Sequence, residues 1–167
     1  KDAKGKIALD LYCGVGLFTL PLARRFEKVF GVETNERAVE SARKNLEHAR
    51  LENVGVFAEP VGEWLNSFEF RLQAANPRED APSEDETQNA VDFILLDPPR
   101  AGAEKETIEQ ILKIKPTRIS YVSCEPSTLA RDLRILTESV YEIESITALD
   151  LFPQTHHVET VAHLKLK

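Results

Sequence analysis

The stretch KIALDLYCGVG, residues 6–16, decides the fold of this chain. Its first part is a short, mainly apolar run, which is typical of a strand buried on both faces within a parallel sheet. Gly14 and Gly16 follow, and they allow a tight turn and a close approach of the backbone to a ligand. The order of strand, glycine loop and helix predicts the first unit of a doubly wound α/β sheet.

Runs of strand length alternate with helical patterns along the rest of the chain. The predicted strands are residues 6–12, 28–33, 53–58, 91–96, 117–123, 140–149 and 157–165, and the predicted helices are residues 17–27, 35–50, 61–70, 104–114 and 126–137. This alternation predicts a Rossmann-like, doubly wound α/β fold. We expect a mostly parallel seven-stranded sheet with an antiparallel edge strand, where the last two strands pair. Right-handed crossovers then place the loops after strands one, two, four and five along one rim.

Size and composition predict a single domain that spans residues 1–167. The chain is 42% apolar and 29% charged, which is ordinary for a globular protein. Two cysteines cannot build a disulfide framework, and no stretch has the pattern of a signal peptide or a membrane span, so we expect a cytoplasmic protein. Because the sequence starts at Lys1 without a methionine, we also expect a fragment of a longer protein.

The net charge of −7 is unusual for a protein that binds nucleic acid, since phosphate-binding surfaces are basic. Residues 76–90 hold five acidic side chains against Arg78 alone and contain almost no large apolar residues. Such a composition cannot offset the entropy cost of ordering, so residues 74–90 are predicted to be an acidic mobile loop insertion. The remainder has no basic stripe. An RNA substrate would therefore be held largely by domains absent from this chain.

The glycine loop and the end of the second strand predict a nucleotide cofactor site. Glu33 lies about 20 residues after the loop begins, where a carboxylate can accept hydrogen bonds from both ribose hydroxyls. A dinucleotide would favour a third glycine, but Phe18 and Thr19 follow Gly16 instead. An acidic residue ahead of the loop, Asp10, suits a ligand with an ammonium group, such as S-adenosylmethionine. We expect that cofactor to be bound by residues of both segments, namely Asp10, Tyr12, Gly14, Gly16 and Glu33.

Asp97-Pro98-Pro99-Arg100 ends the fourth predicted strand at the same rim. The prolines stiffen the turn and present the Asp97 carboxylate, which can bind the cofactor or a base edge. A similar tetrapeptide that ends in an aromatic residue marks methyltransferases acting on exocyclic amines. Arg100 stands in that place here, which counts against an amino methyltransferase.

Cys124 and Glu159 are the candidate catalytic residues. Cys124 follows the fifth predicted strand and precedes a helix whose first residue is expected to be Pro126, and free amides at a helix start stabilise a thiolate. Glu125 beside it is negatively charged and opposes that stabilisation. Glu159 follows a proline turn at the start of the last strand, where its carboxylate can act as a base. We expect Cys13 to be a packing residue, and we expect no metal because no Cys/His spacing indicates one.

Four segments together resemble the RNA uridine-C5 methyltransferases that form 5-methyluridine in tRNA and 23S rRNA. They are DLYCGVGLFTLPLA at residues 10–23, LLDPPRAG at 95–102, YVSCEPSTLARDL at 121–133 and DLFPQTHHVE at 150–159. The resemblance implies that Cys124 is the nucleophile and Glu159 the general base. It also implies that Gly14, Gly16 and Glu33 bind S-adenosylmethionine and that Asp97 lines the pocket.

The chain departs from this family's pattern in three ways. Glu125 stands where the family usually has asparagine, which bears on the tuning of the nucleophile. An upstream Phe-x-Gln-x-Asn pocket segment is absent, as are the RNA-binding barrel and the iron–sulfur cluster that members can carry. The resemblance therefore implies an isolated catalytic domain.

The expected reaction is transfer of a methyl group to C5 of a uridine in RNA through a covalent adduct between cysteine and C6, with rRNA favoured over tRNA. Three alternatives remain open. They are an amino methyltransferase acting on adenine or glutamine, an NAD-dependent oxidoreductase, and a non-catalytic module that binds cofactor or RNA.

Overall fold

The computed structural model describes residues 3–68, 91–151, 153–155 and 158–167. Its seven strands form one sheet in the order β3-β2-β1-β4-β5-β7-β6. The strands are β1 (Gly5–Leu11), β2 (Phe26–Glu33), β3 (Val54–Ala58), β4 (Phe93–Leu96), β5 (Arg118–Ser123), β6 (Tyr141–Leu149) and β7 (Glu159–Leu166). The first five strands are parallel to one another, whereas β7 runs antiparallel to both β5 and β6. The predicted doubly wound sheet with an antiparallel pair at one edge is confirmed, and β6 is the outermost strand of that pair.

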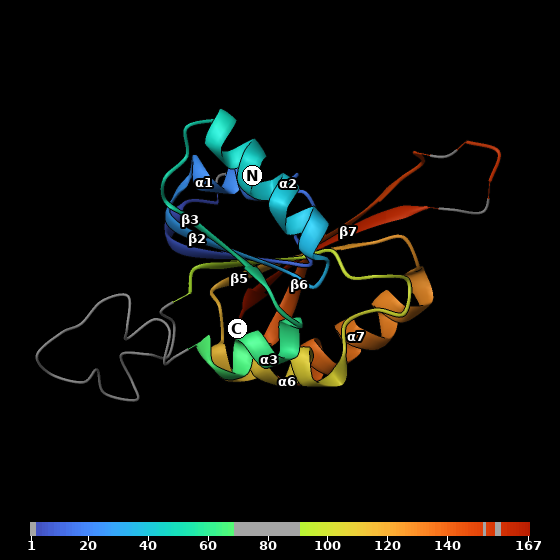
Figure 1. The fold of residues 1–167 in the computed structure, drawn as a ribbon. Helices are drawn as coiled ribbons and strands as arrows, with labels where there is room; N and C mark the ends of the chain where they lie inside the picture. The colour runs from blue at the N-terminus through green and yellow to red at the C-terminus, as the bar shows by residue number, and fades with distance from the viewer. Residues whose placement is uncertain (1–2, 69–90, 152, 156–157) are drawn as a thin grey trace, which may run out of the picture.

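Helices cover both faces of the sheet (Figure 1). On one face lie α1 (Thr19–Ala23) and α2 (Glu36–His48); on the other lie α3 (Val61–Asn66), α6 (Lys105–Ile114) and α7 (Pro126–Glu138). The largest core cluster fills the space under α3, α6 and α7, and its fully buried side chains include Trp64, Ile111 and Leu136. Two smaller clusters lie under α1 and α2. The apolar strands therefore sit between two helical layers, as expected for parallel strands buried on both faces.

The helix predicted at residues 17–27 is wrong in its extent, because α1 ends at Ala23 and β2 already begins at Phe26. Phe26 is the register partner of Gly5 in β1, and its ring stacks on Phe93 at 5.7 Å between centroids. These long-range contacts favour strand over helix for Phe26. The helix predicted from an Asn35 cap is confirmed, since the Asn35 side chain accepts hydrogen bonds from the amides of Arg37 and Ala38.

Several predictions fall on residues outside the described part of the chain. The acidic insertion at 74–90, the end of the helix predicted at 61–70 and the start of the last predicted strand at 157 belong to this group. Within the described residues, no helix is long and apolar enough to cross a membrane. The prediction of a single domain for residues 1–167 remains a prediction.

Candidate active site at the carboxyl rim of the sheet

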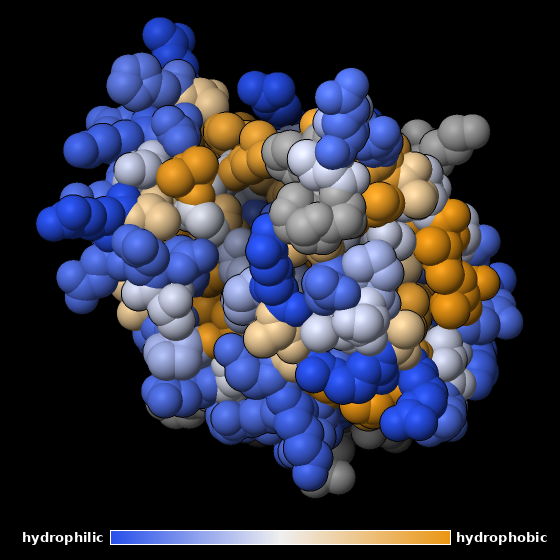
Figure 2. All heavy atoms as spheres, turned by 90° about the vertical axis from the view of Figure 1, so that its right-hand side faces the viewer, coloured by the Kyte–Doolittle hydropathy of each residue, from blue (hydrophilic) through white to orange (hydrophobic). Residues whose placement is uncertain are grey.

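The carboxyl ends of β1, β2, β4 and β5 lie at one rim of the sheet, where ligands bind in open α/β folds. Figure 2 looks onto the side of the molecule where these strands end. Hydrophilic residues there are interspersed with separate hydrophobic groups. Val15 and Leu17 in the glycine loop are exposed apolar side chains, as is Leu151 after β6.

The glycine loop is open on its outer side. Gly14 has a φ of +53°, and a Cβ placed there would meet nothing within 4 Å, so the backbone leaves space for a ligand. A Cβ on Gly16 would make an ordinary van der Waals contact with Cβ of Ala42 in α2 at 3.4 Å, so it is the φ of +87° that favours glycine at this position. The two predicted glycines therefore have different roles, one facing open space and the other facing a helix.

Glu33 links the end of β2 to the glycine loop. Its carboxylate accepts hydrogen bonds from the Gly14 amide at 3.1 Å and from the Asn35 amide at 2.8 Å. Oε1 also accepts from the Thr34 hydroxyl at 3.3 Å, whereas Oε2 accepts the Gly14 amide and has a second acceptor position, because an ionised carboxylate offers about four lone-pair sites. The backbone thus fixes the orientation of Glu33 while leaving it able to accept hydrogen bonds from a ligand.

A pocket of about 430 Å³ opens beside this loop. Three of the predicted site residues, Tyr12, Glu33 and Asp97, line it. The rest of its wall comes from the loop after β2, the start of α3, the loop between β4 and α6, and the first turn of α6. These segments contribute Thr34, Pro60, Val61, Gly62, Glu63, Pro99, Glu104 and Glu106. This volume is in the range of small-molecule sites.

Sequence reasoning missed the carboxylates on the far wall of the pocket. The Tyr12 hydroxyl donates a hydrogen bond to the Glu104 carboxylate, and burial together with this bond raises the pKa of Tyr12. Glu104 lies in the loop that follows β4 and the Asp97-Pro98-Pro99-Arg100 turn. That position at the rim could have identified it as a pocket residue from the sequence. Glu63 and Glu106 gave no such signal, because helices α3 and α6 bring them to the pocket.

Asp10 lies beneath the loop and is completely buried. Burial is the main cause that raises its pKa to about 7, and the Asp97 carboxylate adds to the rise, while a hydrogen bond from the Thr19 hydroxyl opposes it. Its second oxygen, Oδ1, has no hydrogen-bond partner among the described residues. A buried acceptor without a partner is unfavourable, so this position is suited to receive a donor from a ligand.

Asp97, at the end of β4, interacts with groups from both neighbouring regions. Its amide donates a hydrogen bond to the Leu11 carbonyl at 3.3 Å, which holds it level with the end of β1. Partial desolvation raises the pKa of the Asp97 carboxyl, and the Glu159 carboxylate raises it further. Asp10, Asp97 and Glu159 therefore lie close enough to interact electrostatically.

The register of β5 and β7 places the two candidate catalytic residues at the same end of one ladder. Ser123 is paired with Thr160 at the end of the antiparallel ladder. Cys124 is the next residue after Ser123, and Glu159 is the residue before Thr160, so both lie directly beyond that last pair. Cys124 is a free, partly exposed cysteine at the rim.

Helix α7 starts at Pro126, as predicted, directly after the Cys124–Glu125 turn. Glu125 is the N-cap, and its carboxylate accepts hydrogen bonds from the amide and the hydroxyl of Ser127. The Glu125 carboxylate therefore acts as the cap of helix α7. The other cysteine, Cys13, is buried in a packing cluster, and burial raises its pKa to about 12.

The described residues include no group of three or more His, Cys, Asp or Glu side chains arranged to hold a metal ion. The rim offers instead a thiol, a carboxylate and a pocket with acidic acceptors. Such an arrangement can bind a nucleoside-containing cofactor beside a nucleophile.

Comparison with known proteins places this site in a family. The family model described as tRNA (Uracil-5-)-methyltransferase matches residues 1–167. A 23S rRNA (uracil(1939)-C(5))-methyltransferase RlmD from Marinomonas sp. is 40% identical over 165 residues, which cover 99% of this chain and 33% of that protein. An uncharacterized RNA methyltransferase from Streptomyces avermitilis is 44% identical over 165 residues, which cover 97% of this chain and 34% of that protein. The chain spans about a third of the length of the curated relatives it matches.

Solved structures give the same result. The tRNA (uracil-54, C5)-methyltransferase of Pyrococcus abyssi, in complex with S-adenosyl-L-homocysteine, has a TM-score of 0.71 at 35% identity, with 98% of this chain and 35% of that chain covered. An rRNA methylase from Streptococcus thermophilus shares the fold, with a TM-score of 0.69 at 16% identity. The match covers 98% of this chain and 87% of that chain. By the match over its whole length, the chain belongs to the tRNA (uracil-5-)-methyltransferase family.

Proposed function

We propose that this chain is the catalytic part of an S-adenosylmethionine-dependent enzyme that methylates C5 of a uridine in RNA. The observation that carries the proposal is the β5–β7 register, which puts Cys124 and Glu159 one residue beyond the same last pair, at the rim that holds a pocket lined by Tyr12, Glu33 and Asp97. A thiol and a carboxylate are the two groups that a covalent mechanism at a pyrimidine requires.

The residues present fit the proposed cofactor. Glu33, held by two backbone amides, is placed to accept hydrogen bonds from the ribose hydroxyls. The unpartnered oxygen of buried Asp10 suits an ammonium donor, and the open side of Gly14 allows close approach to the loop. S-adenosylmethionine bound there would supply an activated methyl group on a positively charged sulfur. The Pyrococcus abyssi relative was solved in complex with S-adenosyl-L-homocysteine, which supports the same assignment.

Cys124 acts as the nucleophile in this proposal. C5 of uracil is a weak nucleophile, and a thiolate that adds to C6 forms an S–C6 bond and places electron density on C5. Cys124 lies two residues before Pro126, the first residue of α7, and is a free, partly exposed cysteine. The target uridine has to be unpaired or flipped out of its stack to reach this position.

Glu159 acts as the general base. After C5 carries the methyl group, its remaining proton has to leave. Glu159 accepts that proton, the C–H electron pair forms the C5–C6 double bond, and the thiolate of Cys124 is released. The position of Glu159 beyond the same last ladder pair as Cys124, and near Asp97, supports this role.

The RNA substrate is proposed to be ribosomal rather than transfer RNA. The support is that bacterial relatives named as 23S rRNA (uracil(1939)-C(5))-methyltransferases are 40% identical, against 35% for the relative named as a tRNA methyltransferase. Digestion and mass spectrometry of 23S rRNA and tRNA treated with the full-length enzyme distinguish the two, because only the true substrate gains 5-methyluridine.

Two substitutions in the full-length enzyme test the mechanism. Cys124→Ala is expected to abolish both methyl transfer and covalent capture of RNA, since no S–C6 bond can form. Glu159→Gln is expected to methylate once and then remain bonded to the RNA, because the C5 proton cannot leave. Denaturing gels with radiolabelled methyl groups measure both outcomes. A Glu159→Gln enzyme with normal turnover would remove Glu159 from the mechanism, and a turning-over Cys124→Ala enzyme would contradict the covalent route.

A further inference from the structure

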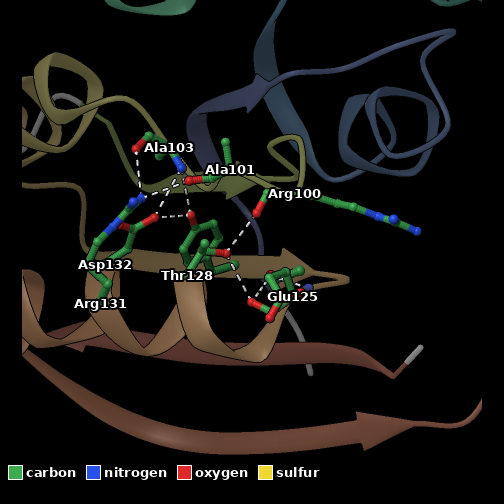
Figure 3. A network of polar contacts seen from close by, with 9 residues as sticks. Arg100, Ala101, Ala103, Glu125, Thr128, Arg131 and Asp132 are labelled. Atoms are coloured by element: carbon green, nitrogen blue, oxygen red, sulfur yellow. Dashed lines mark hydrogen bonds and ion pairs between the residues drawn. The ribbon is translucent and has the colours of Figure 1, made fainter. Parts of the chain in front are cut away.

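One face of helix α7 is bonded to the loop that follows β4 (Figure 3). Thr128, Arg131 and Asp132 are spaced i, i+3 and i+4, so they share one side of the helix. All three form hydrogen bonds to the backbone of residues 100–103. The loop leads from Asp97 to Glu104, and both of these residues line the cofactor pocket.

Thr128 joins the two segments of the site most directly. Its hydroxyl lies 3.1 Å from the Arg100 carbonyl and 3.1 Å from the Glu125 carbonyl. The Glu125 carbonyl already accepts the Leu129 amide at 3.1 Å within the helix ladder. The single hydroxyl proton of Thr128 is shared between these two carbonyls. The contact with Arg100 is the one that leaves the helix, and it links the pocket loop to the turn that carries Cys124.

The neighbouring bonds hold the rest of the loop. Arg131 donates to the Ala101 carbonyl at 3.1 Å, and buried Asp132 accepts from the Ala103 amide at 3.0 Å. Asp132 also accepts from the buried Tyr121 hydroxyl at 2.6 Å and from Arg131 at 2.8 Å. The part of this network formed by Tyr121, Asp132 and the Ala103 amide is buried, and displacing it would leave buried polar groups unsatisfied.

We propose that Thr128 is a positioning residue that sets the distance between the cofactor pocket and Cys124, with Arg131 and Asp132 holding the same loop. This inference rests on the proposed methyltransferase function. Methyl transfer needs the acceptor carbon and the methyl donor in near-attack geometry, and a displacement of about 1 Å can lower the rate about 100-fold. A hydroxyl that bonds the pocket loop to the nucleophile turn controls that separation without touching either ligand.

The test is a set of threonine variants of the full-length enzyme. Thr128→Val keeps the side-chain shape and removes the hydroxyl, and kcat is expected to fall about 10- to 100-fold while KM for RNA and Kd for S-adenosylhomocysteine change less than about threefold. Thr128→Ser restores the hydroxyl and is expected to return kcat to within about threefold of the parent. Arg131→Gln, whose side chain is half exposed, is a second variant expected to lower kcat in the same way.

Thr137→Val is the matched control, because Thr137 lies on the same helix and its hydroxyl bonds only carbonyls of that helix, those of Leu133 and Arg134, among the described residues. It is expected to keep the parent kcat. A Thr128→Val enzyme with normal kcat, a raised KM in place of a lowered kcat, or a Thr128→Ser enzyme as slow as the valine variant would each overturn the positioning role. If the parent enzyme makes no 5-methyluridine, the proposed function is overturned and the positioning role falls with it.

Discussion

At the scale of single residues, Glu33 shows how backbone groups prepare a side chain for a ligand. Two amides, from Gly14 and Asn35, hold its carboxylate in place. Hydrogen bonds to an ionised carboxylate are stronger than those between neutral groups, so the orientation is well fixed. The carboxylate therefore needs little reorganisation when a ribose binds.

Glu33→Gln is expected to weaken binding of S-adenosylhomocysteine about 10- to 100-fold, because hydrogen bonds to a charged acceptor contribute about 1.5–3 kcal/mol. Isothermal titration calorimetry measures this change. Glu36→Gln is the control, since Glu36 is an exposed residue in the first turn of α2. Equal affinity of Glu33→Gln and the parent would show that Glu33 does not bind the cofactor.

Asp10 predicts a pH dependence of stability. Its pKa is raised from 3.8 to about 7 in the folded protein, mainly by burial, so the folded state holds a proton that the unfolded state has already lost. The contribution of Asp10 to stability is therefore greatest below pH 4 and decreases as the pH rises toward 7. Asp10→Asn is expected to remove this decrease and to raise the free energy of unfolding at pH 8 by on the order of 2–4 kcal/mol.

Urea unfolding of the ligand-free parent and of Asp10→Asn at pH 5 and pH 8 checks this prediction. The difference in unfolding free energy between the two proteins should grow with pH. A constant difference across that range would mean that Asp10 is ionised throughout.

At the scale of elements, the turn between β4 and α6 depends on the close fit of one glycine against α7. Gly102 has a φ of +81°, and a Cβ there would lie 2.5 Å from Arg131 Nη2 and 2.7 Å from Asp132 Oδ2. An alanine at this position would be strained in its backbone, and its Cβ would displace the side chains of Arg131 and Asp132 from the loop.

Gly102→Ala is expected to lower the free energy of unfolding by about 2–3 kcal/mol, combining the backbone strain with the displaced buried contacts. Gly14→Ala is the matched comparison, because Gly14 also has a positive φ but faces open space. Gly14→Ala should lower the free energy of unfolding by about 1 kcal/mol. Chemical denaturation without ligand measures the free energy of unfolding of both variants. Equal losses of stability would show that the close contacts of residue 102 with Arg131 and Asp132 do not contribute to the cost.

The sequence predicts most elements and the general architecture of the sheet, but not every element boundary or the order of the two edge strands. The glycine loop, the Asn35 cap and Pro126 are local signals, and the structure bears out each of them. The early start of β2 depends on Phe26 packing against Phe93, which lies 67 residues away, and local patterns do not contain such contacts. For the same reason the placement of β7 between β5 and β6 could not be derived from local patterns.

The candidate site was predictable only in part. Tyr12, Glu33 and Asp97 follow strands and were identified from that position, and they do line one pocket. The bonds from Thr128, Arg131 and Asp132 to the neighbouring loop were not predicted. Their i, i+3, i+4 spacing indicates a common helix face, but the partner of that face becomes known only when the chain has folded.

At the scale of the whole molecule, charge and length limit what this chain can do alone. Its net charge is −7, whereas RNA binding relies on basic groups that neutralise phosphates. The chain also spans about a third of the length of its curated relatives. We therefore propose that RNA is bound largely by parts of the full-length protein beyond these residues, while the chain supplies the cofactor pocket and the two catalytic groups.

The central claim is that Cys124 bonds to the target uridine. Its most direct test is incubation of the full-length enzyme with S-adenosylmethionine and RNA containing 5-fluorouridine, followed by mass spectrometry of the digested protein. The fluorine at C5 cannot leave as a proton does, so the enzyme is expected to stall with one methylated nucleotide bonded to the peptide that contains Cys124. An adduct on a different residue, or methylated RNA released without any adduct, would contradict the account.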